Sequence, residues 1–297
     1  MKLTFLSALT LAGLCIGCGN GVNPTPRNAN APSKGPAAHV ILIVEENQGY
    51  SAIVNQNQMP WLKALGDKYG VATNYYSDEK GSLLDYLWLS SGSSELSFGC
   101  NGNWCTHAIR DNNIFRELNK AGMSWNVYAD SLPSFGFMGM FAGNYAKRHD
   151  PAVWYSDVVD NPEQQENVVP FTQFPVDVAA QNLPDYSIII PNLKDDAHNG
   201  TPQMADQWLK KNIAPLLDSQ YFQASQNSVM FITFDNGWHD EQGQVFTAVV
   251  GQSVIPRVRV NTPFKHENTL RTIMQLLGLK NYPGASATAA PMSEFFK

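Results

Sequence analysis

Three continuous apolar, β-branched runs constrain the fold of this chain more than any other feature. They are HVILIV at 39–44, YSIII at 186–190 and VMFITF at 229–234. Strands without polar alternation are buried on both faces, which is typical of a parallel sheet covered by helices. Amphipathic helical patterns separate the runs, so the sequence predicts an α/β fold with a largely parallel sheet.

Other elements follow from periodicity and capping residues. We expect further strands at 71–75, 124–128 and 245–250, and helices over 59–69, from Ser82, over 114–120, from Thr201 and Pro202, and from an Asn268 cap to Gly278. No internal repeat interrupts the pattern. One domain over 37–297, with insertions around 93–112 and 129–180, accounts for the length.

The N-terminus has the pattern of an export signal. Lys2 precedes an apolar run over 3–14, which has signal-peptide length, and Gly17-Cys18 resembles a bacterial lipobox. We expect a signal peptide over 1–17, a lipidated Cys18 and a flexible Gly-, Asn- and Pro-rich linker over 18–36. The protein is then an extracytoplasmic lipoprotein, in the periplasm or at the cell surface. The alternative is an ordinary secretory signal and a secreted protein.

The cysteines predict a covalent link, and the net charge excludes one class of partner. Cys100 and Cys105 lie beyond the signal, and an oxidising compartment favours a local disulfide between them. A two-cysteine metal site is the alternative, although only His107 lies close in sequence as a further ligand. The net charge is −6 and no Lys/Arg-rich run occurs, so we expect no nucleic-acid partner.

Each of the three buried runs leads into polar residues. The first continues into Glu45, Glu46 and Asn47, the second into Asp195, Asp196 and His198, and the third into Asp235 and Asn236. Ligands bind beyond the carboxyl ends of parallel strands, where these oxygens converge. Such a cluster fits a divalent cation, Mg²⁺, Ca²⁺ or Mn²⁺, and the nearby histidine admits Zn²⁺. The alternative is that these are ordinary solvated strand ends.

Two further features carry possible chemistry. Ser82 stands at a predicted helix start, where it is either an N-cap or a nucleophile activated by the helix dipole. Lys147, Arg148 and His149 form a cationic block in an acidic chain. This block is either a phosphate clamp or a solvated turn.

Six ordered blocks resemble a known family. They lie at 39–50, 82–86, 143–151, 183–200, 230–237 and 266–279, and the resemblance spans residues 37–297. The chain is similar to the phosphoesterase family of acid phosphatases and phospholipases C, in the alkaline-phosphatase-like superfamily. Within it, the likeness is greatest to secreted bacterial acid phosphatases of the phosphatidylinositol-3-phosphate phosphatase type. The resemblance implies a three-layer α/β sandwich.

The resemblance also implies roles for individual residues. The metal ligands are Glu46, Asn47 and Asp235, with Asn236 where the family usually has an acidic residue. Ser82 matches the nucleophile, and His198 and His266 match catalytic histidines. Residues implied to face the substrate are Asp196, Lys147, His149, Lys80 and Asp85.

Two residues beside Ser82 depart from the family pattern. Lys80 replaces a histidine, and Asp85 replaces an asparagine that faces the phosphate. Asp85 either repels a phosphate dianion or faces away, paired with Lys80. We expect an exported, metal-dependent phosphomonoesterase that acts through a phosphoserine at Ser82. The alternatives are a phospholipase C-type phosphodiesterase and a catalytically weakened phosphate-binding lipoprotein.

Overall fold

The structure is a computed structural model that describes residues 36–297 apart from 95–98, 223–226, 239 and 241. The predicted signal, Cys18 and the linker up to residue 35 lie outside the described residues. The strands are β1 Val40–Glu45, β2 Gly70–Ala72, β3 Trp125–Ala129, β4 Phe141–Ala142, β5 Tyr145–Ala146, β6 Val168–Pro170, β7 Tyr186–Ile190, β8 Val229–Phe234, β9 Thr247–Gly251 and β10 Val258–Val260. The α-helices are α1 Tyr50–Val54, α2 Pro60–Lys68, α3 Ser82–Ser91, α4 Ile114–Ala121, α5 Ser156–Val159, α6 Pro162–Gln165, α7 Gln173–Ala179, α8 Pro202–Leu217 and α9 His266–Leu276.

Eight of these strands form one central sheet, in the order β10-β2-β9-β8-β1-β7-β3-β6. The three apolar runs are the neighbouring strands β8, β1 and β7, which are parallel to one another. Strand β9 is antiparallel to both of its neighbours, β8 and β2. The largely parallel sheet predicted from the sequence is therefore confirmed, and β9 is its exception.

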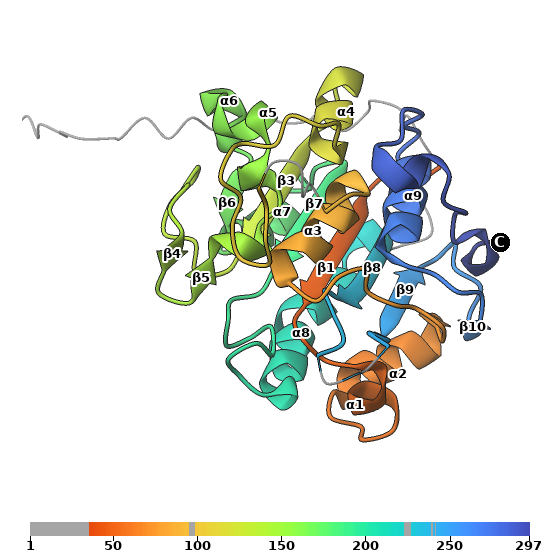
Figure 1. The fold of residues 1–297 in the computed structure, drawn as a ribbon. Coiled ribbons are helices and arrows are strands. Elements are labelled where there is room, and N and C mark those ends of the chain that lie inside the picture. Colours follow the sequence, from red (N-terminus) through yellow and green to blue (C-terminus); the bar gives the residue numbers. More distant parts are fainter. Residues whose placement is uncertain (1–35, 95–98, 223–226, 239, 241) are drawn as a thin grey trace, which may run out of the picture.

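Helices cover the sheet. Figure 1 shows α3, α4 and α9 in front of it, and α3 packs against both α4 and α9. Helix α2 packs against α8. Every residue of β1 and β8 is buried, which requires cover on both faces of the sheet. The α/β sandwich predicted from the sequence is confirmed.

Helix boundaries follow the expected capping residues with one exception. The Thr201 side chain accepts from the Met204 N–H at 3.2 Å, and Gly122 ends α4 at a φ of 62°. Asn268 does not begin the last helix as predicted. Helix α9 starts two residues earlier, and the Asn268 side chain accepts from the Lys265 N–H at 2.7 Å, inside the first turn. In return the Asn268 N–H donates to the Lys265 carbonyl at 3.1 Å, and these two bonds form the first turn with Lys265 as the N-cap.

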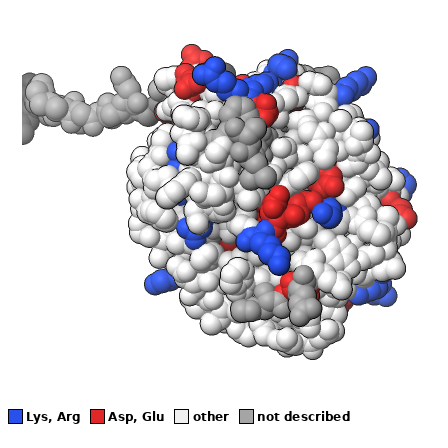
Figure 2. Space-filling model, viewed as in Figure 1, with Lys and Arg blue, Asp and Glu red and all other residues white. Residues whose placement is uncertain are grey.

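Within the described part of the chain, no helix has the length and apolar character needed to cross a membrane. The face shown in Figure 2 is mostly uncharged, and acidic and basic side chains lie beside one another near its middle. The parallel strands point their carboxyl ends toward one edge of the sheet, which is where the polar residues expected from the sequence come together.

Candidate active site

The ends of the three central strands are tied to one another by main-chain hydrogen bonds. The Glu46 N–H donates to the Asp196 carbonyl at 2.8 Å, and the Asp235 N–H donates to the Glu45 carbonyl at 2.9 Å. Segments some 150 and 190 residues apart in sequence are thereby fixed side by side. The side chains that follow β1, β7 and β8 meet at one edge of the sheet, as parallel strand order requires.

Ser82 is held in this cluster by its hydroxyl. Its Oγ donates to Glu46 Oε2 at 2.8 Å. Gly81, not Ser82, occupies the N-cap of α3, and no side chain caps that helix end. The N-cap alternative for Ser82 is therefore wrong: the hydroxyl is committed to a carboxylate across the site instead of to its own helix.

Hydrogen bonds link Asp235 to two of the other predicted metal residues. Asp235 Oδ1 accepts from the Asn47 N–H at 3.0 Å, and Asp235 Oδ2 accepts from Asn236 Nδ2 at 2.7 Å. Asn47 adopts a positive φ of 56°, a conformation that asparagine tolerates better than most residues. The structure thus brings Glu46, Asn47, Asp235 and Asn236 together with Ser82.

Buried negative charge gives the site its electrostatic character. Burial, followed by the charges of Asp235 and Asp196, raises the pKa of Glu46 well above its usual range. Burial is also the main cause that raises the pKa of Asp235 and that of Asp196. Glu46 Oε1 and Asp196 Oδ2 are buried and accept no hydrogen bond, although a ring nitrogen of His149 lies 3.2 Å from each. A cation among these carboxylates removes the repulsion and satisfies the unpaired oxygens, so the residues present fit a divalent metal ion.

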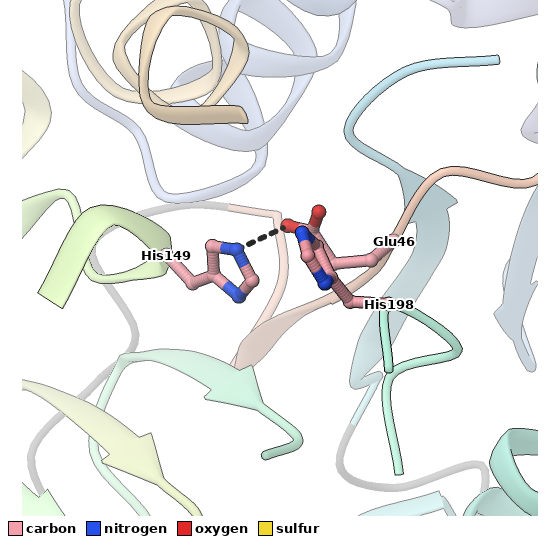
Figure 3. A group of neighbouring side chains, drawn as sticks. All are labelled: Glu46, His149 and His198. Atoms are coloured by element: carbon pink, nitrogen blue, oxygen red, sulfur yellow. Dashed lines mark ion pairs between the residues drawn. The ribbon is translucent and has the colours of Figure 1, made fainter. Parts of the chain in front are cut away.

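Two histidines approach Glu46 from other segments, as Figure 3 shows. His149, from the 3₁₀ turn Lys147–His149, places Nε2 at 3.2 Å from Glu46 Oε1 and Nδ1 at 3.2 Å from Asp196 Oδ2. Burial, with the nearby Arg148 and His198, lowers the pKa of His149 well below its usual range. Ligand atoms of Glu46, His149 and His198 lie within 4.8 Å of one another. Neutral imidazole is a metal ligand, so this group admits Zn²⁺.

The resemblance implied Lys147 and His149 from the cationic block, and the structure adds Arg148 to the cavity wall. Lys147 Nζ donates to the Met138 carbonyl at 3.2 Å and lies 4.6 Å above the Trp154 ring, so it is engaged away from Ser82. Arg148 and Ser82 line one cavity, the catalytic cavity. The Arg148 Nη2 lies 3.1 Å from His198 Nε2. Successive side chains of a 3₁₀ turn diverge, which separates Arg148 from its neighbour.

His266 is engaged through both ring nitrogens. It is fully buried, its Nε2 lies 2.6 Å from the Asp235 carbonyl oxygen and its Nδ1 lies 3.0 Å from the Tyr75 hydroxyl. A histidine with both nitrogens occupied and no exposed surface has no free position for a substrate proton. The structure therefore favours a role for His266 in positioning the Asp235 backbone.

Asp85 is buried and is not one of the residues that line the cavity. It is fully buried, and its Oδ1 accepts from the N–H groups of Asp78 and Glu79 at 3.0 and 2.9 Å. Lys80 is exposed on the cavity wall, and among the described residues no carboxylate lies within ion-pair distance of it. Asp85 thus does not line the cavity, and its partners are these two backbone amides and His266, whose Nε2 lies 3.5 Å from Oδ1, and not Lys80.

The catalytic cavity has a volume of about 790 Å³ and one wall made by the predicted disulfide loop. Cys100 and Cys105 are joined, which confirms the disulfide. Gly102 and Asn103 line the cavity, and the Gly102 carbonyl accepts from the Leu83 N–H at 3.2 Å. A Cβ on Gly81 would lie 2.6 Å from the Gly102 Cα, so the two backbones touch immediately before Ser82.

Opening this loop should weaken both the fold and the site. For the Cys100→Ser/Cys105→Ser variant we expect the free energy of unfolding to fall by about 2 kcal/mol, the chain-entropy value for so short a loop. We also expect KM for a phosphate ester to rise several-fold, because the Gly102 wall loses its constraint. Urea unfolding and steady-state kinetics measure both. An unchanged KM in a folded variant would show that the disulfide does not hold this wall.

Asp150, next to the site, should give a pH-dependent stability. It is fully buried, and burial is the largest cause that raises its pKa to about 7. The unfolded chain titrates near pH 3.9, so between about pH 4 and 7 the folded state binds more protons and loses stability as the pH rises. An asparagine at this position does not titrate, so Asp150→Asn does not lose stability in this way as the pH rises. The free energy of unfolding of Asp150→Asn minus that of the parent should therefore grow as the pH rises from about 4 to 7. The growth should reach about 4 kcal/mol, at roughly 1.4 kcal/mol per pH unit.

Urea unfolding at pH 4.5, 6 and 7.5 measures this difference. Asp157→Asn serves as the control with the opposite sign, because the Asp157 carboxylate accepts from Arg116 Nε at 2.9 Å and its removal should destabilise at neutral pH. A difference between Asp150→Asn and the parent that does not vary with pH would mean that Asp150 is ionised in the folded protein throughout.

Several solved structures have a fold similar to that of this chain. A protein of the alkaline phosphatase superfamily from Vibrio parahaemolyticus aligns with a TM-score of 0.60 at 9% identity, covering 89% of this chain and 72% of that one. The C-terminal periplasmic domain of EcEptC from Escherichia coli, determined as a complex with Zn, aligns with a TM-score of 0.52 at 12% identity, covering 92% and 91%. The fold of this chain is therefore the α/β fold that these two structures share.

Sequence comparison then gives the family. Residues 52–280 match the model of the Phosphoesterase family, and the chain belongs to that family. A phosphatidylinositol-3-phosphatase from Mycobacterium tuberculosis is 29% identical over 93% of this chain and 88% of its own length. A probable acid phosphatase from Kluyveromyces lactis is 30% identical over 72% of this chain, which spans about half of the length of that relative, 51%. The protein is a phosphoric ester hydrolase.

Proposed function

We propose that this protein is a metal-dependent phosphomonoesterase that forms a phosphoserine at Ser82. The observation that carries the proposal is the hydrogen bond of 2.8 Å from Ser82 Oγ to Glu46 Oε2, at an uncapped helix N-terminus beside Asp235. A hydroxyl in that position faces a cavity and lies in the positive field of the helix. The names of the relatives, a phosphatidylinositol-3-phosphatase and acid phosphatases, support hydrolysis of monoesters.

The cavity residues account for substrate binding. Lys80 and Arg148 are the cationic side chains on its wall, and they face a phosphate dianion on the side of Ser82. Glu46 Oε2 holds the Ser82 proton, so that the oxygen lone pairs point toward the bound phosphorus. As the bond from Oγ to phosphorus forms, Glu46 Oε2 takes the hydroxyl proton, the bond from phosphorus to the ester oxygen breaks, and the leaving alkoxide takes a proton from water. A second water then attacks the phosphoserine, which releases inorganic phosphate and restores the Ser82 hydroxyl.

Glu46, Asn47, Asp235 and Asn236 would hold a divalent cation, and the chemistry it would supply is a lower pKa for a nearby hydroxyl and stabilisation of charge on a phosphoryl oxygen. His198 is partly exposed on the cavity, and its Nε2 accepts from Arg148 while Nδ1 faces Asn199 Oδ1 at 2.8 Å. This tautomer leaves Nε2 unprotonated. Because Arg148 occupies Nε2, His198 can accept a proton from the attacking water only once Arg148 transfers its hydrogen bond to the bound phosphate.

The test compares p-nitrophenyl phosphate with bis(p-nitrophenyl) phosphate, before and after removal of metal by a chelator. We expect turnover of the monoester, its loss in the metal-free protein and its recovery with one of Mg²⁺, Ca²⁺, Mn²⁺ or Zn²⁺. Preference for the diester would favour a phospholipase C-type phosphodiesterase. Binding of phosphate without turnover would favour a phosphate-binding lipoprotein, and turnover unaffected by the chelator would contradict the metal dependence.

We also propose that the protein is exported and lipidated at Cys18. The motif at Gly17-Cys18 and the composition of the linker support this, and a short-range disulfide is typical of exported proteins. The mass of the mature N-terminus in a bacterial host tests it. A first residue other than Cys18, or a Cys18→Ser variant that stays in the membrane fraction, would contradict the anchor.

A further inference from the structure

A second cavity, of about 390 Å³, adjoins the catalytic cavity. The two share Lys80, Asn236 and Trp238 in their walls. The second cavity falls within the range of about 300–1,000 Å³ that small-molecule sites occupy. A substrate whose phosphate meets Ser82 can therefore extend past these three residues into the second cavity.

The lining of the second cavity combines an aromatic surface with carboxylates. Trp238, which lines both cavities, leaves 57% of its surface exposed. Glu79 and Asp240 lie on the walls. Asp240 Oδ1 accepts from the N–H groups of Gln242 and Gln244 at 3.0 and 3.2 Å, which fixes the turn that carries it.

These groups select by charge and by shape. Carboxylates accept hydrogen bonds from hydroxyl groups and repel anions. An exposed indole binds the flat apolar face of a ring. Lys80, the cation on the shared border, lies next to the phosphate side of the substrate. The second cavity therefore favours a neutral ring with hydroxyl groups over an anionic or ringless leaving group.

We propose that the second cavity is the leaving-group site and that it selects phosphomonoesters of neutral hydroxylated rings, namely sugars or cyclitols. The C–H face of the ring packs on Trp238, and ring hydroxyls donate to Glu79 and Asp240. This inference rests on the proposed phosphomonoesterase activity, because it assigns the part of the substrate that leaves.

The test compares glucose 6-phosphate with ethyl phosphate. Both are primary alkyl monoesters, so the ratio of their kcat/KM values isolates the contribution of the ring. We expect the parent to favour glucose 6-phosphate, and Trp238→Ala to lower the ratio about tenfold, mainly through KM for glucose 6-phosphate. Phe141→Ala is the control, since Phe141 is similarly exposed, at 62%, and lines neither cavity. It should leave the ratio unchanged.

A second variant tests the charge. Glucose 1,6-bisphosphate carries an anionic group on the same ring, so the parent should hydrolyse it poorly, and Glu79→Gln should improve it relative to glucose 6-phosphate. An unchanged ratio in folded Trp238→Ala protein, or a parent preference for the bisphosphate, would overturn the proposal. If the parent hydrolyses none of these esters, the phosphomonoesterase activity itself has failed. Calorimetric titration of glucose 6-phosphate into the parent and Trp238→Ala then decides whether the cavity binds the ring.

Discussion

Ser82→Ala should abolish phosphomonoester turnover, with kcat lowered by a factor of about 10³–10⁶, the range seen when an enzyme loses its nucleophile. The reason is geometric. Ser82 Oγ is the hydroxyl directed at Glu46 Oε2, within the cavity that Arg148 and Lys80 line. Metal content should be largely retained, because the carboxylates of the site remain. Single-turnover kinetics, with trapping of the phosphorylated protein by acid quench, give the direct measurement.

Ser91→Ala is the matched control for this variant. Ser91 lies on the same helix, is also buried, and donates to the Leu87 carbonyl at 2.9 Å inside α3. It should keep parent activity, which separates loss of the nucleophile from damage to the helix. Near-parent turnover in Ser82→Ala, or a phosphorylated residue other than Ser82, would show that the nucleophile is misassigned.

Asp235→Asn should weaken metal binding by at least about 100-fold and lower activity in parallel, because it removes a buried carboxylate from the centre of the site. Both oxygens of Asp235 accept hydrogen bonds, from the Asn47 N–H and Asn236 Nδ2. The isosteric amide keeps the size of the side chain and loses its charge. Metal content after dialysis, together with kcat at saturating metal, measures the effect.

Asp177→Asn controls for the loss of a buried carboxylate elsewhere. Asp177 accepts from the Tyr128 hydroxyl and from Gln173 Nε2, both at 2.7 Å, and it is not part of the catalytic cavity. We expect Asp177→Asn to lose some stability and to keep its full metal content. Full metal occupancy in Asp235→Asn would refute the assignment of Asp235 as a ligand.

The resemblance to a known family and the strand ends together predicted much of the site. Glu46, Asn47, Asp235 and Asn236 were expected to converge with Ser82, and the structure places them in one cluster. The sequence could not show which of three consecutive residues in the cationic block faces the cavity. Side-chain direction in a 3₁₀ turn depends on the turn's orientation, and that orientation is set by packing against distant segments. Arg148 therefore emerged only from the structure.

His266 and Asp85 illustrate a second limit of prediction from the sequence. Both match site residues of the family that the chain resembles, but their burial and their hydrogen-bond partners decide which role each can have. His266 has both nitrogens occupied by Tyr75 and the Asp235 backbone, and Asp85 accepts from two amides of the preceding loop. Hydrogen-bond partners at sequence separations of 31 and 191 residues are not readable from local pattern.

The sequence by itself determined the sheet, its helical cover and the edge at which polar side chains gather. Hydrophobic periodicity and β-branched runs are local properties, and parallel pairing follows from burial on both faces. Only the tertiary structure decided that Ser82 is bonded to Glu46 instead of capping α3, that the disulfide loop forms a cavity wall, and that Trp238 borders two cavities. These features depend on contacts between segments far apart in the chain, whose geometry is fixed by the packing of the whole domain.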